Sequence, residues 1–272
     1  MTSTNTNAFD IAKSLPKRQF FSMQHCTDVV DELDYVLARA MSGEPTGLVI
    51  SGPTGVGKSS ILKYHKVTYD TRLAEGENSP IVLVKTPSKP SDSLMLEHEL
   101  KALGDPNPYY GKPNMKRSRR DALLALRKVK VLVYDDFQHI VEHRGTHVAR
   151  QLLDELKNLS EEFCISLVFT GIDSVELVGL INEQIDSRFS TVVNVKVMSV
   201  ENDEEFGYFK LFINKLITSK GLKDKKLFEN DFIYRFYYAC EADLRILNNL
   251  FNKAMFWQQK EGNKQITLAH FA

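Results

Sequence analysis

Short apolar runs recur along the first two thirds of the chain, and longer amphipathic stretches separate them. The runs are rich in Val, Leu and Ile and are bounded by polar residues or by Gly and Pro; they cover residues 47–51, 81–85, 129–134, 164–170 and 192–197. Continuous apolar runs of this length are typical of buried parallel strands. Because helix-like segments alternate with them, the pattern predicts an α/β fold in which helices wrap a parallel sheet.

The pattern changes after about residue 198, where the strand-like runs stop. Apolar residues then recur at helical spacing over residues 202–219, 227–240 and 242–260. We therefore expect an α/β domain at 16–198 and a small all-α domain at 199–272. The polar N-terminus, residues 1–15, is expected to be disordered.

A glycine-rich loop lies between the first predicted strand and the helix expected at residues 59–65. Its pattern, GxxxxGK[ST], lets the backbone curl so that its N–H groups face phosphate oxygens, while Lys58 reaches the β- and γ-phosphates and the Ser59 hydroxyl binds Mg²⁺. An ordinary glycine-rich turn is the alternative, but a strand before the loop and a helix after it favour ATP binding. The predicted nucleotide-binding residues in this loop are Gly52, Pro53, Thr54, Gly55, Val56, Gly57, Lys58, Ser59 and Ser60.

Two adjacent carboxylates, Asp135 and Asp136, follow the third apolar run. Downstream of a phosphate loop, the first of such a pair binds Mg²⁺ with Ser59 and the second is the base that orients the attacking water. A solvated acidic turn is the alternative. The second carboxylate is usually Glu, and Asp is one methylene shorter, so we expect slow ATP hydrolysis. Thr170 ends the next strand, where it either contacts the γ-phosphate or serves as a structural hydroxyl.

Composition restricts the partners of the chain. Lys and Arg number 35, Asp and Glu number 35, and the formal net charge is zero, so only a local patch could bind nucleic acid. The three cysteines are far apart and are expected to be reduced thiols in the core of a cytoplasmic protein. There is no signal-peptide pattern, and no apolar run approaches the ~18 residues of a membrane span.

The most basic segment begins at Lys112, where Pro113 suits the first turn of a helix. Its cations are expected on the outer faces of that helix, with Ala122, Leu123, Leu126 and Val129 packed inward. Such a cluster in a neutral chain fits contact with DNA phosphates, although a solvated amphipathic face is the alternative. The candidate DNA-binding residues are Lys112, Lys116, Arg117, Arg119 and Arg120.

From about Lys17 to the C-terminus, the sequence resembles the AAA+ ATPases and, among them, the transposition regulators TnsC and TniB. The resemblance rests on the phosphate loop, the YDDFQHIVEHR stretch at 134–144, the FTG segment, DSRF at 186–189 and EADLR at 241–245. The acidic pair followed by Phe, Gln and His is especially similar to TnsC of CRISPR-associated transposons. The departure from this pattern is Asp136, which bears on the rate of hydrolysis and not on binding.

The resemblance implies further roles. Arg188 would be an arginine finger that completes the site of a neighbouring subunit, and Arg245 would sense the γ-phosphate in its own subunit; each is otherwise a surface arginine. Lys89 would contact DNA from the interior of a ring. The implied protein oligomerises with ATP as a ring or filament on double-stranded DNA. It would recruit a transposase and an adaptor of the TniQ type.

Three other functions share parts of this pattern. A helicase loader or replication initiator would keep every ATP residue and differ in its partners. A small-molecule kinase needs an acceptor site and a lid that closes over it, whereas the last third of this chain is predicted to be an all-α domain. A protein-unfolding motor usually carries an aromatic pore loop, and the corresponding segment here is basic.

Overall fold

The computed structural model describes residues 26–142, 146–178, 191–222, 224–263, 266 and 268–271. The predicted disordered segment at 1–15 therefore lies outside the described residues. The chain folds into two compact units. The larger contains Cys26–Pro53 and Lys58–Lys196, and the smaller contains Thr54–Gly57 and Val197–Ala272.

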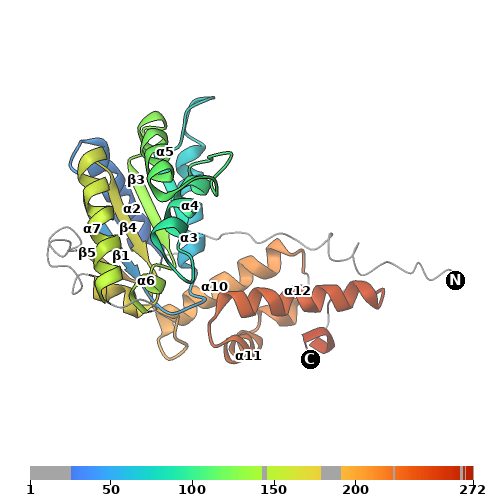
Figure 1. The fold of residues 1–272 in the computed structure, drawn as a ribbon. Coiled ribbons are helices and arrows are strands. Elements are labelled where there is room, and N and C mark those ends of the chain that lie inside the picture. Colours follow the sequence, from blue (N-terminus) through green and yellow to red (C-terminus); the bar gives the residue numbers. More distant parts are fainter. Residues whose placement is uncertain are drawn as a thin grey trace. The chain divides into compact units, whose positions relative to one another are not determined.

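The larger unit is built on a five-stranded parallel sheet, which confirms the predicted α/β fold (Figure 1). Its strands lie in the order β2-β3-β4-β1-β5. Their bounds are β1 (Gly47–Ser51), β2 (Ile81–Lys85), β3 (Val131–Asp135), β4 (Ser166–Thr170) and β5 (Thr191–Asn194). In this order β1 has β4 on one side and β5 on the other.

Helices surround this sheet (Figure 1). After two of these helices, a residue in the left-handed conformation makes the following strand shorter than predicted. Lys128 (φ 53°) and Cys164 (φ 51°) adopt this conformation just after helices α5 and α7, so β3 and β4 each begin two residues later than predicted. The helical elements are α2 (Thr27–Met41), α3 (Lys58–Asp70), α4 (Asp92–Ala102), α5 (Pro113–Leu126), α6 (Gln138–Glu142), α7 (Thr146–Phe163) and the 3-10 helix η2 (Asp173–Leu177).

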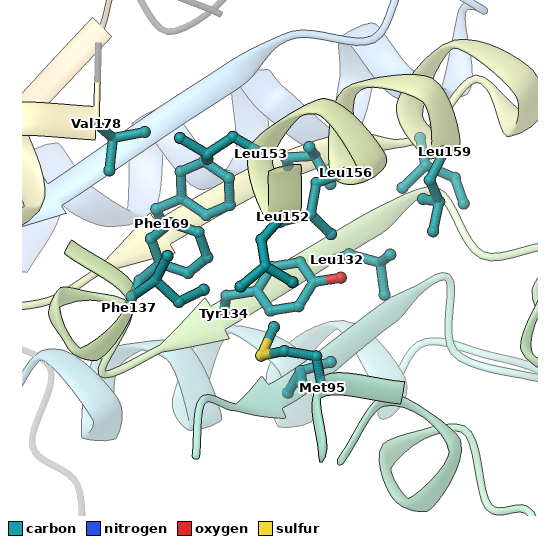
Figure 2. Packing of buried hydrophobic residues seen from close by; sticks show 14 of the residues in the cluster. Met95, Leu132, Tyr134, Phe137, Leu152, Leu153, Leu156, Leu159, Phe169 and Val178 are labelled. Carbon is teal, nitrogen blue, oxygen red and sulfur yellow. The ribbon is translucent and has the colours of Figure 1, made fainter. Parts of the chain in front are cut away.

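Three buried aromatic rings fix the carboxyl ends of β3 and β4. Phe137 and Phe169 are stacked with ring centroids 3.9 Å apart, and Tyr134 packs edge-on against Phe137. Leucines of α7 cover these rings, as Figure 2 shows for Leu152, Leu153 and others. Burying one large apolar side chain contributes roughly 1.5–3 kcal/mol, so this cluster holds the turn after β3 firmly.

The smaller unit has its own aromatic core, which includes Phe209, Phe236 and Phe251. Its helices α11 and α12 are joined by Glu241 and Ala242, which both have positive φ (48° and 57°). Asp243 then caps α12. The elements are α10 (Asp203–Ser219), η3 (Lys225–Phe228), α11 (Asn230–Cys240), α12 (Leu244–Lys260) and η4 (Leu268–Phe271). The predicted boundary after residue 198 remains a prediction.

The cysteines only partly follow the sequence-based expectation. Cys26 and Cys240 are buried, and burial raises the pKa of the Cys240 thiol to about 11. Cys164 is exposed because it lies in the turn that ends α7, so the expectation of three core thiols is wrong for this residue. Among the helices described, none has the length and apolar character needed to cross a membrane.

Candidate nucleotide site

The two ends of the glycine-rich loop are held within the larger unit. Lys58, the first residue of α3, donates from Nζ to the carbonyl oxygens of Gly52 (2.6 Å) and Pro53 (2.7 Å). Gly52 has φ 146°, and a Cβ there would lie 2.3 Å from the carbonyl oxygen of Val195. Only glycine fits this position. The ammonium group of Lys58 is thus placed inside the curl of the loop, bound to backbone oxygens that a phosphate oxygen could replace.

The centre of the loop, Thr54–Gly57, belongs to the smaller unit together with the start of α12. The Gly55 carbonyl accepts a hydrogen bond from Leu244 N (3.1 Å). A Cβ on Gly55, which has φ 83°, would lie 2.1 Å from the carboxylate of Asp243. That carboxylate accepts from the backbone N–H groups of Arg245 and Ile246 and caps α12.

Arg245 forms an ion pair with Asp243, with Nη2 3.1 Å from Oδ2, and its side chain is 56% exposed. Partial burial pushes the pKa of Asp243 upward, but hydrogen bonds from Arg245 and Ile246 outweigh it and lower the pKa. The predicted contact of Arg245 with a γ-phosphate remains a prediction. Arg188, the predicted arginine finger, lies outside the described residues.

The carboxyl edge of the sheet brings Asp135 and Thr170 together. Asp135 ends β3, and its Oδ1 accepts hydrogen bonds from Thr170 Oγ1 (2.7 Å) and from Asp136 N (3.2 Å). Thr170 is fully buried and ends β4, which lies between β3 and β1. Its hydroxyl therefore has a structural role in holding Asp135, while contact with a γ-phosphate remains a prediction.

Asp136 lies in the turn after β3 with φ 59°, a conformation that Asp tolerates better than most residues. Its carboxylate lies 3.6 Å from Lys85 Nζ at the end of β2. Sequence reasoning missed Lys85; the signal was a cation at the end of a strand that pairs with the acidic one. Position 136 thus combines a side chain shorter than Glu with a backbone conformation that suits Asp.

Two oxygen-bearing side chains, those of Ser59 and Asp135, match the number of ligands that a protein usually contributes to a bound Mg²⁺. This ion is commonly held by one or two side chains, by waters and by the substrate phosphates. In the described part of the chain, no three His, Cys, Asp or Glu side chains gather into a metal site of their own. Binding of Mg²⁺ by Ser59 and Asp135 remains a prediction.

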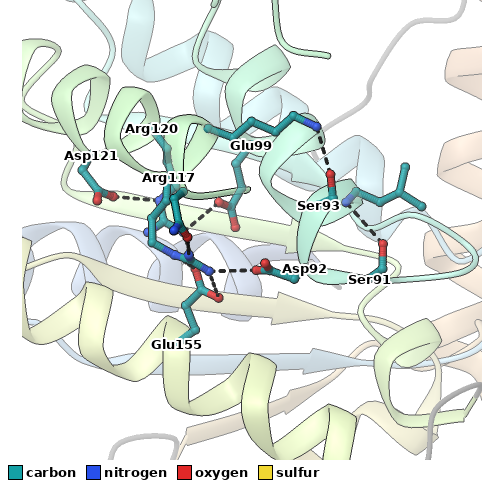
Figure 3. Close-up of polar contacts among 11 residues, drawn as sticks. Ser91, Asp92, Ser93, Glu99, Arg117, Arg120, Asp121 and Glu155 are labelled. Atoms are coloured by element: carbon teal, nitrogen blue, oxygen red, sulfur yellow. Dashed lines mark hydrogen bonds and ion pairs between the residues drawn. The ribbon is translucent and has the colours of Figure 1, made fainter. Parts of the chain in front are cut away.

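The structure gives the predicted DNA-binding cations of α5 other partners (Figure 3). Lys116 is 3% exposed and bonds to Ser93 and Glu97, and Arg120 is 4% exposed. The Arg120 guanidinium pairs with carboxylates from three different elements, namely Glu99, Asp121 and Glu155. In this conformation neither Lys116 nor Arg120 can reach a DNA phosphate, so placing them on outer faces was wrong.

Arg117 and Arg119 are also engaged, although they are partly exposed. Arg117 pairs with Asp92 and with Glu155, each at 2.9 Å. Arg119 pairs with Asp105 and donates to the carbonyls of Tyr110 and Asn107, which fixes the turn before α5. The expected inner face is also wrong for Ala122 and Leu126, which are exposed, while Leu124 is buried.

A buried polar relay joins this network to β3. The Tyr134 hydroxyl donates to Glu99 Oε1 (2.8 Å), and Glu99 Oε2 pairs with Arg120 at 3.2 Å. Burial raises the pKa of Glu99 and of Tyr134. Burial also pushes the pKa of Glu155 upward, but Arg117 and Arg120 outweigh it and lower the pKa.

The network borders a hollow of about 700 Å³. Five carboxylates and two guanidinium groups are among its lining side chains: Asp92, Asp121, Asp154, Glu155, Glu162, Arg117 and Arg120. This excess of negative charge repels phosphates. Of the six candidate DNA-binding cations, Lys89 and Lys112 are the exposed ones. Tyr109 and Tyr110, shortly before α5, are 66% and 69% exposed.

Comparison with known proteins adds the family. A family model described as "Bacterial TniB protein" matches residues 12–198, more than half of the chain. The chain belongs to the TniB family. A comparison with curated protein sequences finds no match.

Solved structures resemble the TniB-family chain in fold at low sequence identity. The ORC1 protein of Aeropyrum pernix in complex with DNA has 14% identity and a TM-score of 0.69, covering 92% of this chain and 64% of its own. The ORC2 protein of the same organism, as ADPNP-ADP complexes, has 12% identity and a TM-score of 0.68, with coverages of 98% and 70%. Cdc6p of Pyrobaculum aerophilum has 16% identity and a TM-score of 0.63, with coverages of 94% and 67%.

These likenesses establish an AAA+ P-loop fold for the chain. The chain spans about two thirds of the length of these proteins (64–70%), so their activities and partners do not transfer with the fold.

Proposed function

We propose that this protein is an ATP-dependent, DNA-binding AAA+ regulator of transposition. It oligomerises on double-stranded DNA as a ring or filament and links target-site selection to a transposase. Membership of the TniB family supports the role in transposition. One structural observation supports ATP chemistry above the others: Lys58 lies in the curl of the loop while Thr170 holds Asp135 at the adjoining sheet edge.

The proposed reaction is hydrolysis of the β–γ bond. Ser59 and Asp135 hold Mg²⁺, which supplies charge neutralisation on the phosphates when it is bound. Lys58 exchanges its backbone acceptors for phosphate oxygens, and Asp136 accepts a proton from the attacking water. Hydrolysis is slow because Asp136 is short. The nucleotide therefore acts as a switch. Only while a γ-phosphate is present does Arg188 bridge to the neighbouring subunit, and only then does Arg245 connect the C-terminal helical domain to the nucleotide.

DNA contact is assigned to exposed cations. Lys89 and Lys112 are exposed, and a few lysines suffice for backbone contact without base recognition. By resemblance to TnsC of CRISPR-associated transposons, the partners are a transposase and an adaptor of the TniQ type. A replication initiator or helicase loader is the second candidate, favoured by the likeness to ORC and Cdc6 folds.

Electron microscopy with double-stranded DNA and a slowly hydrolysed ATP analogue tests assembly, and DNA-stimulated ATPase activity tests the chemistry. We expect ordered rings or filaments with the analogue and none with Lys58→Ala. Monomers at every salt concentration would contradict the proposal. Stimulation by a metabolite instead of DNA would indicate a kinase, and co-purification with a helicase would indicate the loader.

A further inference from the structure

Gln138 begins α6, two residues after Asp136, and its side chain is almost completely buried. The residue is 8% exposed. Its Oε1 has no hydrogen-bond donor among the residues that the structure describes. Leaving a buried acceptor without a partner costs about 1–3 kcal/mol, and such groups in native proteins commonly belong to functional sites or hold an ordered water.

The unpaired oxygen lies against the end of β4. A Cβ on Gly171 would be 2.4 Å from Gln138 Oε1, so the glycine leaves room for the amide in this position. Gly171 follows Thr170, whose hydroxyl holds Asp135, and the Gly171 N–H donates to Ile50 near the start of the phosphate loop. The amide of Gln138 thus lies in the larger unit, at the edge where β1, β3 and β4 end.

The backbone next to this amide is held by its neighbours. Phe137, the preceding residue, is stacked on Phe169, and its N–H donates to the Thr170 carbonyl (2.8 Å). The same contacts therefore hold Asp135, Thr170 and Gln138. A backbone held in this way reduces the reorganisation needed when the amide binds a donor, which helps to orient a reactant.

A water molecule is the donor that the proposed reaction brings to this edge. It carries two O–H groups, and a short carboxylate such as Asp136 can accept only one of them. A glutamine amide orients the attacking water in some GTPases, so the chemistry is suitable. The missing methylene at Asp136 leaves the water less constrained, and a second acceptor would restore that constraint.

We propose that Gln138 accepts a hydrogen bond from the attacking water and so shares its positioning with Asp136. The inference rests on the proposed ATPase function. In the step, the water oxygen bonds to the γ-phosphorus, the bond from that phosphorus to the β–γ bridging oxygen breaks, and one water proton passes to Asp136. ADP and phosphate leave, and the amide neither gains nor loses a proton.

The test compares Gln138→Met, which keeps the volume and removes the amide, with Gln138→Glu, which keeps an acceptor oxygen. Turnover, ATP affinity and the Tm of the nucleotide-free protein are measured for each. We expect Gln138→Met to lower kcat about tenfold, the usual scale for losing one positioning contact, with ATP affinity unchanged. Its Tm should stay the same or rise, because an unpaired buried acceptor is removed. Gln138→Glu should keep most of the turnover.

Each other outcome overturns the inference. An unchanged kcat in Gln138→Met would show that the amide does not touch the water. A fall in Tm, ATP affinity and kcat together would show a purely structural role. If wild-type protein and Gln138→Met hydrolyse ATP at the same rate, the inference about Gln138 fails but the proposed function stands. If wild-type protein never binds ATP, both the inference and the proposed function are contradicted.

Discussion

Two neighbouring residues of β3 lead to two very different sets of charges. Tyr134 joins the network around Arg120, where each guanidinium faces carboxylates from several elements. Asp135 belongs to the sheet edge, where Lys58 is bound to backbone carbonyls and Gln138 Oε1 has no described donor. In the first set each guanidinium is paired with carboxylates, whereas the second holds an ammonium group that donates to neutral carbonyls and a buried amide oxygen with no donor among the described residues.

The difference separates charge that stabilises from charge that can bind. A buried guanidinium with carboxylate partners has little to gain from a phosphate, because it would first lose those partners. An ammonium group on backbone carbonyls exchanges neutral acceptors for a charged one and gains by it. The four predictions below test this contrast.

The largest expected effect is on stability. Arg120→Met removes the centre of the buried network and leaves Glu99 and Glu155 without this cationic partner, which should reduce the free energy of unfolding by about 3–5 kcal/mol. Urea denaturation measures it. The control is Lys112→Met, an exposed cation next to the same helix, which should change stability by no more than about 0.5 kcal/mol.

A small loss of stability in Arg120→Met together with weakened DNA binding would reverse the assignment. It would mean that Arg120 leaves its carboxylates when DNA is present.

Lys58→Ala should weaken ATP binding at least ~100-fold, about 2.7 kcal/mol, because a charge-assisted contact to phosphate is lost. Stability should change little, since Lys58 Nζ donates to neutral backbone carbonyls of Gly52 and Pro53. Calorimetric titration measures the affinity. Lys63→Ala, an exposed lysine on α3, is the matched control and should bind ATP normally. Equal losses in both variants would sink the prediction.

Asp136→Glu should raise ATP turnover about tenfold, because the longer side chain holds the water better. It should also lower stability by ~1 kcal/mol, since φ 59° suits Asp better than Glu. Steady-state hydrolysis and thermal melting measure the two effects. Asp136→Asn places a residue that also suits this backbone conformation but removes the base, so this variant should lose turnover and keep its Tm. Turnover that is unchanged or lower in Asp136→Glu would refute slow hydrolysis by a short base.

The smallest effect concerns pH. Because the pKa of Glu155 is lowered in the folded protein, its ion pairs stabilise the fold above the ordinary carboxyl pKa. This stability is lost as pH falls through the lowered value. Glu155→Gln should cost about 1 kcal/mol near pH 7 and nothing at strongly acidic pH. Denaturation across that range measures it. A constant difference at all pH values would point to packing instead of charge.

The sheet was predictable because its strands carry their own signal. Runs such as Gly47–Ser51 and Ile81–Lys85 are mostly apolar since helices cover both faces of the sheet, and the structure reproduces their bounds. The carboxyl-edge residues follow from this, because parallel strands end on one side. The strand starts at 131 and 166 were missed because they depend on left-handed turn residues, Lys128 and Cys164.

The environment of α5 was not predictable from local pattern. Lys116 and Arg120 look like surface cations because their partners, Glu97, Glu99 and Glu155, lie 19 to 35 residues away on other helices. Helical spacing shows which residues share a face but not whether that face is charged and buried. Gln138 was missed for the same reason, since its burial arises from Gly171, 33 positions later.

The place of β1 in the sheet has a consequence for synthesis of the protein. Gly47 pairs with Leu167, and Leu48 pairs with Thr191, so both neighbours of this strand are made more than 100 residues after it. At about 5–20 residues per second, the strand waits several seconds or longer on the ribosome. Its apolar residues Leu48, Val49 and Ile50 would be open to chaperones or to other nascent chains during that time. Substitutions that delay the pairing of β4 or β5 with β1 should therefore reduce the yield of folded protein before they change the final fold.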